Sequence, residues 1–533
     1  MTYRILIADE VRQEGIDLLA RRPDFQVDVK TDLSPDALLE VAQDYHGLVV
    51  RSATQVTAEV IRAASRLKVI ARAGAGLDNI DVPEATRRGI LVMNTPGGNS
   101  VATAEHTVSL VMALHRHVPV AVASLKSGKW EKKKFQGREM AGRTLGIIGL
   151  GRVGSIVCRL AERGLNMRVL GYDPVISQES ASRMGAQLVP LDELFRRSDV
   201  ITVHVPLNDQ TRSIVDARAF GMMQPGVMIV NCARGGVIDE EALLEALESG
   251  KVGAAALDVY SVTPPGMHPL VLHPRVIATP HLGASTIEAQ INVSVAVAEQ
   301  IIGYLEEGIV SNAVNVPSVG ATEVRRMQPY MDLAFKLGRL LSWLAPGAIT
   351  EMEVQYRGEI VTWDLRPITN AGLVGLLSRF EGEEANYVNA ATIAKDRGIR
   401  ISETTVKTEG ERASSLALRS EFSDGSSHTV RGSLFPRRGN EPRITGIDNF
   451  VTEALPAGPM LIVSNTDVPG MIAGISGALA ERGINIAQMN LSRESVGGTA
   501  LSIINLDDPA DESTLQRIRD IEGILSVRQV ILD

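Results

Sequence analysis

The stretch Gly149-Leu-Gly-Arg-Val-Gly154 decides the fold of the chain, because its three glycines stand between a strand pattern and a helix pattern. The apolar residues 144–149 predict a strand, residues 153–163 predict a helix, and residues 167–172 predict a second strand that leads into Asp173. A glycine-rich turn in this setting, with an acidic residue about twenty positions later, is typical of a dinucleotide-binding Rossmann unit. The competing interpretation is a glycine-rich turn that binds nothing.

Each residue of this turn has its own expected task. Gly149 permits the tight turn, Gly151 lets the backbone approach a pyrophosphate, and Gly154 lets the helix pack closely on the strand. The phosphates would lie at the helix N-terminus, where backbone N–H groups and the helix dipole favour an anion. Asp173 would accept hydrogen bonds from the adenine ribose and would repel a 2′-phosphate. Because Pro174 rather than a basic residue follows, the sequence predicts NAD as the cofactor.

Similar α/β patterns extend from this stretch in both directions. Enough further strands are predicted on its C-terminal side to complete a doubly wound parallel sheet, at 200–205, 227–231, 254–258 and 276–279. A second parallel sheet, covered on both faces, is predicted on its N-terminal side from strands at 3–8, 47–51 and 68–71 and helices at 11–21 and 58–64. Two longer helices are expected, over 101–126 and from Thr286 to about Leu305.

The C-terminal part of the chain has a different pattern. Residues 350–450 alternate like strands, and Thr408–Pro442 is expected to form surface hairpins. After the linker-like segment Leu455–Pro459 the pattern predicts strand, helix and strand, then a polar gap, then strand, helix and strand.

Composition excludes several classes of function. The net charge of -9 argues against a broad nucleic-acid-binding surface. Cys158 and Cys232 lie in separate apolar segments, so neither a disulfide framework nor a metal site is expected. The N-terminal residues lack the pattern of a signal peptide, and no run of about 18 apolar residues predicts a membrane span. We therefore expect a cytoplasmic protein with neither nucleic acid nor membrane as a partner.

Three polar segments follow predicted strands and would meet at the carboxyl edge of one sheet, where α/β proteins bind ligands. They carry Arg234, Asp258 and His281. Arg234 can grip a substrate carboxylate and polarise the neighbouring oxygen, and His281 can take or give the hydroxyl proton while hydride moves to the nicotinamide. Asp258 could bind the nicotinamide carboxamide or the arginine. A histidine alone is more often structural, but this combination predicts a catalytic pair in a dehydrogenase.

These motifs, together with Arg51-Ser-Ala-Thr54, Asn94-Thr-Pro-Gly-Gly-Asn99 and Pro280-His-Leu-Gly-Ala-Ser-Thr286, resemble those of the D-3-phosphoglycerate dehydrogenases, a branch of the D-2-hydroxyacid dehydrogenases. The resemblance spans essentially the whole chain, including the additional C-terminal domains of the long form. It implies NAD-dependent oxidation of 3-phospho-D-glycerate to 3-phosphohydroxypyruvate, the first step of L-serine biosynthesis.

The resemblance also implies the fold class and the domain order. An α/β Rossmann domain would be inserted in a flavodoxin-like substrate domain, followed by an α+β intervening domain and a ferredoxin-like ACT domain. The expected ranges are 1–98 and 287–316 for the substrate domain, 99–286 for the NAD-binding domain, 317–454 for the intervening domain and 459–533 for the ACT domain. A homo-oligomer, dimer or tetramer, is implied, with contacts through the 101–126 helix and the tail.

Further site residues are implied by the resemblance. Arg51 and Arg72 would join Arg234 in binding the phosphorylated substrate. The run Lys132–Lys134 would add phosphate contacts across a dimer interface or would be a solvated surface. The implied cofactor pocket consists of Ala75, Gly149, Gly151, Arg152, Val153, Gly154, Asp173, Val205, Cys232, Ala233, Arg234, Asp258, His281, Gly283 and Ala284.

One position departs from the family pattern. The family pairs its catalytic histidine with a glutamate, and Thr263 stands where that glutamate is expected. Threonine can hydrogen-bond but cannot neutralise an imidazolium. The site is therefore expected to be slow, to recruit another carboxylate such as Glu288, or to have lost catalysis.

The tail segment Leu461–Gly470, followed by Arg482–Ile486, resembles an ACT domain. Asn465, Asp467 and Asn485 offer a carboxylate and amides suited to L-serine, which the resemblance implies as an effector. The competing interpretation is that these residues cap turns, as Asn and Asp often do.

Two other functions remain open. One is a related D-2-hydroxyacid dehydrogenase with an unphosphorylated substrate, against which Arg51 and Arg72 argue. The other is a catalytically weakened paralogue that senses NAD and serine, which only Thr263 favours.

Overall fold

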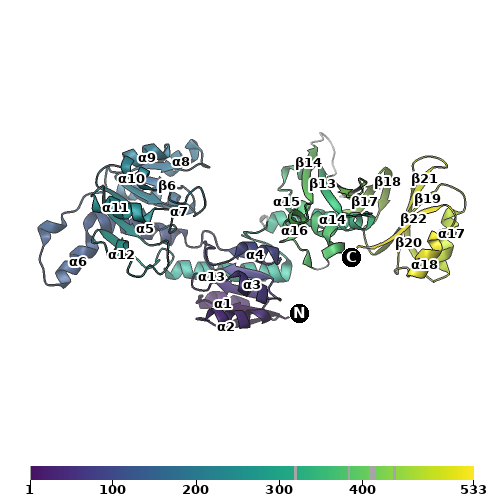
Figure 1. The fold of residues 1–533 in the computed structure, drawn as a ribbon, viewed down its shortest axis with the longest axis horizontal. Coiled ribbons are helices and arrows are strands. Elements are labelled where there is room, and N and C mark those ends of the chain that lie inside the picture. Colours follow the sequence, from purple (N-terminus) through teal and green to yellow (C-terminus); the bar gives the residue numbers. More distant parts are fainter. Residues whose placement is uncertain (1, 317–320, 382–383, 407–413, 436–439, 533) are drawn as a thin grey trace.

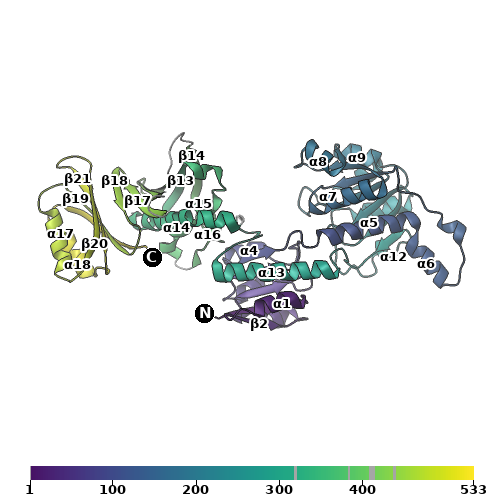
Figure 2. The same ribbon diagram turned by 180° about the vertical axis from the view of Figure 1, so that it is seen from behind.

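Four sheets follow one another along an elongated molecule in the computed structural model, which describes residues 2–316, 321–381, 384–406, 414–435 and 440–532 (Figure 1). The sheet that carries the glycine-rich turn lies at one end, the N-terminal sheet lies next to it, and the two C-terminal sheets occupy the other end. Helix α13 (Ile287–Glu307) returns the chain from the first of these units to the N-terminal sheet, as both views show (Figure 2). The α/β fold class is confirmed, while the domain limits given above stay a prediction.

The N-terminal sheet is parallel and has the flavodoxin-like order β2-β1-β3-β4-β5. Its strands are β1 (Tyr3–Ile7), β2 (Phe25–Val29), β3 (Gly47–Val50), β4 (Val69–Arg72) and β5 (Leu91–Asn94). Helices α1 (Gln13–Ala20) and α13 cover one face. The other face is covered by α2 (Pro35–Val41), the 3-10 turn η1 (Ala42–Asp44), α3 (Ala58–Ala63) and α4 (Val82–Arg87). Strands β2 and β5 at the two edges were not expected.

The second sheet is also parallel, in the doubly wound order β12-β11-β10-β9-β6-β7-β8. Its strands are β6 (Thr144–Ile148), β7 (Arg168–Tyr172), β8 (Ala186–Leu188), β9 (Val200–Val203), β10 (Val227–Asn231), β11 (Val252–Leu257) and β12 (Val276–Ala278). One face packs on α5 (Ser100–Arg116), α7 (Arg152–Arg159), its π-helical extension η3 (Leu160–Gly164) and α8 (Gln178–Met184). The other packs on α9 (Leu191–Arg197), α10 (Ala217–Met222), α11 (Glu240–Glu248) and α12 (Pro269–Leu272). The six predicted strands are confirmed, and the short edge strand β8 adds a seventh.

The prediction of one continuous helix over 101–126 is wrong in one respect, because the helix breaks at His117. Helix α5 ends there and α6 (Val118–Lys126) begins at a bend of 61°. Pro119 has no N–H to donate to the carbonyl of His115, and His117 between the two helices has a left-handed φ of 53°. The freed carbonyl accepts the Arg138 N–H at 3.0 Å instead. No single described helix is both long and apolar enough to cross a membrane; α5 and α6 reach that length and composition only as this bent pair.

The third sheet has the order β14-β13-β15-β16-β17-β18 and packs on two long helices. The helices are α14 (Ala321–Leu344) and α15 (Arg366–Glu381), with the shorter η4 (Glu359–Thr362) and α16 (Ala390–Asp396) beside them. The strands are β13 (Ile349–Arg357), β14 (Arg400–Val406), β15 (Ser415–Phe422), β16 (Ser427–Phe435), β17 (Glu441–Ile447) and β18 (Phe450–Ala454). Strands β15 and β16 form a hairpin within the predicted Thr408–Pro442 region, and β17 pairs with β16 but extends beyond that region to Ile447; residues 408–413 and 436–439 lie outside the described residues. The expectation of surface hairpins is wrong for these strands, because they lie inside the sheet and bury Leu418, Val430 and Ile444 in its core.

The fourth sheet is antiparallel, in the ferredoxin-like order β20-β21-β19-β22, and its element order matches the prediction for the tail. It contains β19 (Pro459–Thr466), α17 (Met471–Ala480), β20 (Ile486–Arg493), β21 (Thr499–Leu506), α18 (Glu512–Arg519) and β22 (Ile524–Ile531). The two helices cover one face. On the other face Met460, Ile503 and Val530 pack into the core of the third sheet, so the two C-terminal sheets share one apolar core.

Candidate active site

The glycine-rich turn between β6 and α7 has the geometry that a dinucleotide needs. Gly149 has φ 93°, which favours glycine, and a Cβ there would collide with the His204 carbonyl and with Val205. A Cβ on Gly154 would collide with the Gly149 carbonyl, whereas Gly151 borders open space. The turn is therefore closed where the strand and helix pack and open where a pyrophosphate would approach, so the residues present fit NAD.

Asp173, directly after β7, also organises this turn. Its Oδ2 accepts the Leu150 N–H at 2.9 Å and its Oδ1 accepts the Val175 N–H at 2.9 Å. The carboxylate is half-buried; its Oδ1 also accepts the Ile176 N–H at 3.3 Å, so Oδ2 is the oxygen that keeps a lone pair for a further donor. Its contact with a ribose stays a prediction, but its hold on the glycine-rich turn is a second role that the sequence did not indicate.

The other residues predicted for the cofactor come from several segments, and their contact with NAD stays a prediction. Cys232 and Ala233 are buried beyond β10, and burial raises the pKa of the Cys232 thiol to about 12, so this thiol stays protonated. Arg152 is exposed and extends towards Gly97, in the segment that joins the two sheets. Ala75 belongs to the N-terminal sheet, where its carbonyl accepts from Asn94 at 2.7 Å. The remaining members, Val153 and Ala284, are half-buried beside Gly154 and Gly283.

Arg234 reaches from the second sheet to the N-terminal sheet. It follows β10, and its Nε lies 3.2 Å from Oδ2 of Asp78 in the loop after β4. A Cβ on Gly76 in that loop would collide with the Arg234 guanidinium, so the glycine makes room for it. Asp78 and Gly76 were not predicted as site residues. Their contact partner, Arg234, lies far from them in the sequence, so no local sequence pattern indicates the contact.

Arg72 lies close to both Arg234 and Arg51, which adds two cations to this region. Arg72 ends β4, and burial, assisted by repulsion from Arg234 and Arg51, lowers its pKa to about 10. Its Nε is buried without a hydrogen-bond partner among the described residues, and its guanidinium lies against Gly74. Arg51 donates from Nη1 to the Glu10 carbonyl at 3.1 Å. Arg72 is thus close enough to Arg234 and to Arg51 for their charges to repel it, while Asp78 and Asp9 act in the opposite direction; an anion site here stays a prediction.

His281 faces the arginines from a strained turn after β12. Its φ of 56° lies in the left-handed region, and its N–H contacts the Thr279 carbonyl at 3.0 Å. The residue is open to solvent on the cleft side, but the atoms around it lower its pKa by desolvation, and Arg234 and Arg72 lower it further. Asp258 and Asp78 act in the opposite direction. A histidine that is neutral near neutral pH can accept a proton.

Asp258, at the end of β11, holds the turn that carries His281. Its Oδ1 accepts from Thr279 Oγ1 at 2.6 Å and from the Leu282 N–H at 2.7 Å, and its Oδ2 accepts from the Gly283 N–H at 2.8 Å. Burial opposes ionisation, yet these bonds, with one from His106, keep the pKa of Asp258 below its usual range. The carboxylate thus binds both residues that follow His281, rather than the Arg234 side chain that we had considered.

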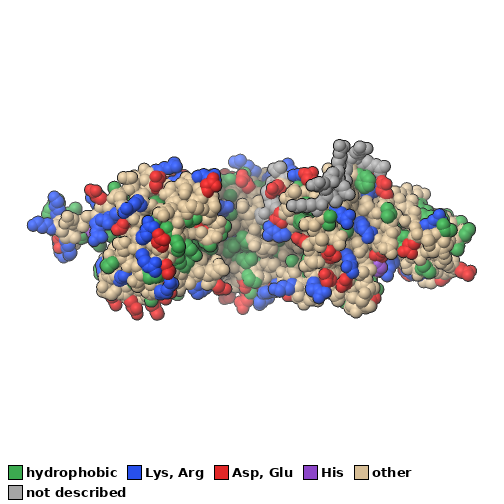
Figure 3. Space-filling model, turned by 90° about the horizontal axis from the view of Figure 1, so that it is seen from above, with side chains coloured by type: hydrophobic (Ala, Val, Ile, Leu, Met, Phe, Trp, Pro, Cys, Tyr) green, Lys and Arg blue, Asp and Glu red, His purple; other side chains and the backbone are tan. Residues whose placement is uncertain are grey.

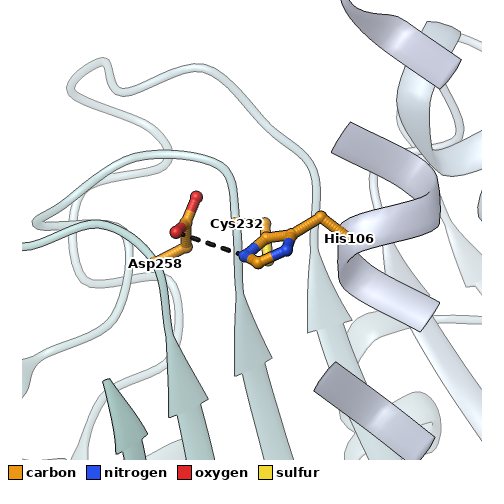
Figure 4. A group of neighbouring side chains, drawn as sticks. All are labelled: His106, Cys232 and Asp258. Carbon is orange, nitrogen blue, oxygen red and sulfur yellow. Dashed lines mark ion pairs between the residues drawn. The ribbon is translucent and has the colours of Figure 1, made fainter. Parts of the chain in front are cut away.

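His106 on α5 completes this cluster (Figure 4). Its Nε2 lies 3.3 Å from Oδ1 of Asp258, and the Cys232 sulfur lies beside the pair. The ligand atoms of the three residues lie within 4.8 Å of one another. Because both oxygens of Asp258 already accept backbone N–H bonds and the thiol is protonated, the cluster is built as a hydrogen-bond support for the His281 turn.

Thr263 and Glu288 do not supply a carboxylate partner for His281. Thr263 is exposed in the loop after β11, which Glu240 anchors through the Ser261 N–H at 2.7 Å and the Ser261 hydroxyl at 2.8 Å. Among the hydrogen bonds between described residues, none joins Thr263 to His281. Glu288 is exposed in the first turn of α13, and the carboxylates that raise the pKa of His281 are Asp258 and Asp78.

The lysine run lies far from these residues in the chain's own fold. Lys132–Lys134 form the exposed 3-10 turn η2 (Lys132–Phe135), and Lys134 lies 3.6 Å from Glu131. Together with α6 this turn makes a projecting tip that carries basic side chains (Figure 3). The phosphate role of the run stays a prediction that needs a second chain.

The residues predicted to bind serine are not brought together within one chain. Asp467 follows β19 and accepts from Arg493 at 3.0 Å and from the Gly497 N–H at 3.2 Å. Asn465 is buried, and its Oδ1 has no partner among the described residues. Asn485 bonds Asp507 at 2.8 Å, at the opposite end of the sheet. Because β19 ends beside Thr499 and β20 begins beside Leu506, the two ends are about 23 Å apart at about 3.3 Å per residue.

Comparison with known proteins agrees with this architecture. The family profile of the D-isomer specific 2-hydroxyacid dehydrogenase NAD binding domain matches residues 108–283, that of the D-3-phosphoglycerate dehydrogenase intervening domain matches 326–448, and that of the ACT domain matches 460–523. A solved glyoxylate reductase from Paecilomyes thermophila superposes with a TM-score of 0.53 at 32% identity, over 59% of this chain and 98% of that structure.

Two relatives match along all or nearly all of their length. The D-3-phosphoglycerate dehydrogenase of Synechocystis is 43% identical over 522 residues, which cover 98% of this chain and 93% of the relative. That of Archaeoglobus fulgidus is 42% identical over 532 residues, which cover 99% of this chain and all 100% of the relative. The chain therefore belongs to the D-3-phosphoglycerate dehydrogenase family of D-isomer specific 2-hydroxyacid dehydrogenases.

Proposed function

We propose that this chain oxidises 3-phospho-D-glycerate to 3-phosphohydroxypyruvate with NAD, the first step of L-serine biosynthesis. The observation that carries the proposal is the convergence of Arg234, Arg72 and His281, which lie close enough together for the two arginines to lower the pKa of the histidine. The names of the whole-length relatives support the same reaction.

The three side chains have distinct tasks in this reaction. Arg234 binds the substrate carboxylate and orients the adjacent C2 hydroxyl, which requires the guanidinium to exchange Asp78 for the substrate. His281, neutral because its pKa is lowered, accepts the hydroxyl proton as the C–O bond becomes a carbonyl. NAD, when bound, supplies the acceptor for the hydride that leaves C2.

Arg72 and Arg51 provide positive charge for the second anionic group of a phosphorylated substrate. A 2-hydroxy acid without a phosphate needs one cation for its carboxylate, which Arg234 provides. Burying Arg72 beside Arg234 costs free energy in the empty cleft, and that cost is relieved when a phosphate enters. This argument favours the phosphorylated substrate over the unphosphorylated alternative.

Asp258 provides part of what the family's glutamate would supply. It holds the His281 turn through three short hydrogen bonds, and its charge raises the pKa of the imidazole. We therefore propose that Thr263 slows the enzyme without abolishing catalysis. The exposed, unbonded position of Thr263 is also the one observation that favours the sensor alternative.

L-Serine as an effector and a homo-oligomeric state complete the proposal. Within one chain Asn465 and Asp467 lie at one end of the ACT sheet and Asn485 at the other, so a serine site that uses all three needs a second chain. This arrangement links the effector to the assembly, a dimer or tetramer.

Substrate selectivity tests the proposed function. NADH formation is measured with 3-phospho-D-glycerate, D-glycerate and D-lactate, and NADH binding is titrated by fluorescence in the same preparation. The proposal predicts that kcat/KM for the phosphorylated acid exceeds the others by more than about tenfold, because one charged contact contributes about 1.5–3 kcal/mol. Equal rates would support the unphosphorylated alternative, and binding without turnover would support the sensor.

A further inference from the structure

A cavity of about 830 Å³ lies between the N-terminal sheet and the third sheet, away from the catalytic cleft. The N-terminal sheet contributes Lys68, just before β4, and Gly89, just before β5, while Arg72, which is predicted to bind the substrate, stands at the far end of β4. The cavity therefore occupies the amino edge of the sheet, and the substrate site occupies its carboxyl edge. An occupant of one would not touch an occupant of the other.

Specific contacts hold the two walls of the cavity together. The Asn386 amide donates to the Gly89 carbonyl at 3.1 Å, and a Cβ on Gly89 would collide with Asn386. Val388, which follows in the same segment, is buried in the core of the N-terminal sheet. Helix α16 also packs against α4, as the ribbon shows (Figure 1). The space is thus a defined gap in a packed interface.

The charges that line this gap are mostly positive. Arg66, Lys68 and Arg88 are exposed to it, and Glu307 is the one acidic side chain among its described lining residues. That carboxylate already lies 3.7 Å from Arg325. The potential of the cations is felt nearby, because burial and then Arg66 and Lys68 lower the pKa of His46 in the same wall. A cation-lined cavity with low-dielectric walls attracts anions.

The remaining lining combines apolar and aromatic side chains with the polar Ser65, Gln328, Asn370 and Asn386. Leu67, Val310 and Met331 approach from three different segments, and Tyr387 stands partly exposed on the side of the third sheet. A volume of this size, mostly apolar with a few convergent polar groups, is typical of sites for small organic molecules. We propose that the cavity binds a small organic anion, with its acidic group towards Arg66, Lys68 and Arg88 and its apolar body against Met331 and Tyr387.

This site would join two units of the chain. One wall belongs to the sheet that carries Arg72 and the other to the sheet that shares its core with the ACT-like sheet. A ligand that fills the gap would favour the conformation in which the two walls are in contact, and it would thereby stabilise one placement of the C-terminal half. The proposed site is independent of the proposed reaction, because ligand binding in the cavity requires neither catalytic turnover nor serine.

The test uses 8-anilinonaphthalene-1-sulfonate, a fluorescent aromatic anion, with the full chain at saturating NAD so that the dinucleotide cleft is occupied. We expect one probe bound per chain. Arg66→Glu should weaken binding by about tenfold or more, because it replaces an attractive charge by a repulsive one. Ser65→Trp should do the same without a change in charge, by filling the cavity from its exposed wall. Arg21→Glu, at an exposed arginine outside the cavity, is the matched control and should bind as wild type.

Two results would overturn the proposal. One is wild-type affinity in both Arg66→Glu and Ser65→Trp, and the other is loss of all probe binding from the wild type when NAD is added. NADH binding and near-ultraviolet circular dichroism confirm that each variant is folded, so that weakened binding in a folded variant supports the site. If either Arg66→Glu or Ser65→Trp fails to fold, the probe affinity of the other variant decides the test.

Discussion

Replacing Asp258 by Asn tests how the His281 turn is held. The carboxylate accepts three hydrogen bonds of 2.6, 2.7 and 2.8 Å, two on Oδ1 and one on Oδ2. An amide has one oxygen, so in either orientation its NH2 group faces the N–H of Leu282 or of Gly283. At least one charge-assisted bond, about 1.5–3 kcal/mol, is lost, and each of the other two weakens by about 1 kcal/mol when the charge is removed. The turn then loses about 4 kcal/mol of support.

This loss of stabilising free energy exceeds the backbone strain at His281 that the hydrogen bonds offset. A non-glycine residue in the left-handed region, such as His281 with φ 56°, costs about 1–2 kcal/mol. With the support gone, the turn relaxes and the imidazole moves. Because a misplacement of about 1 Å costs about 10²-fold in rate, kcat should fall by about two orders of magnitude. The acid limb of the pH profile should also move to lower pH, since Asp258 raises the pKa of His281.

The assay separates this role from direct cofactor binding. Steady-state NADH formation is measured across pH at saturating NAD, and the Kd of NADH is measured by fluorescence. Asp216→Asn is the matched control, because Asp216 caps α10 by accepting the Ala219 N–H at 2.8 Å and Asn is an equally good cap. A kcat that survives at saturating NAD, with only the affinity for NAD weakened, would refute the positioning argument and would return Asp258 to the nicotinamide role predicted from the sequence.

Three further results are expected. Arg72→Gln should raise the KM for 3-phospho-D-glycerate by about tenfold or more, through the loss of one charged contact, and should leave D-glycerate turnover almost unchanged; equal losses for both acids would contradict its phosphate role. Thr263→Glu should increase the single-turnover rate of hydride transfer and move the acid limb to higher pH, because a carboxylate near His281 raises its pKa; an unaltered rate and profile would count against this role for position 263. Titration calorimetry with L-serine should give heat that is lost in Asp467→Asn, and no heat from the wild type would remove serine as the effector.

Much of the fold could be predicted because its signals are local. The glycine-rich turn and the short apolar strands on either side of it indicate a doubly wound sheet without reference to the rest of the chain. Strand β2 was missed because it lies at an edge with its side chains partly exposed, and β8 because it has only three residues. Helix α15 was missed because it is buried on nearly every side and therefore lacks a polar stripe at helical spacing. The break at His117 was hidden because Pro119 stands at a helix start, where proline is tolerated.

The site could be predicted only in part, for a related reason. Arg234 and His281 follow strands, and the carboxyl edge of a parallel sheet brings such residues together. Asp78 and His106 come from a loop of the other sheet and from a helix, and only the packed structure places them beside Arg234 and Asp258. In the tail, Asp467 and Asn485 are close in the sequence, but the strand register places Asn485 at the opposite end of the sheet from Asp467.

The most direct test of the proposed function compares the wild type with His281→Asn. NADH formation from 3-phospho-D-glycerate and NAD is followed with the product removed, and NADH binding is measured in both proteins. We predict sustained turnover by the wild type and a loss of about 10²–10⁴-fold in the variant with NADH binding retained, as expected for removal of a general base. A wild type that binds NADH tightly but forms none from 3-phospho-D-glycerate, or a variant that is equally fast, would contradict the account.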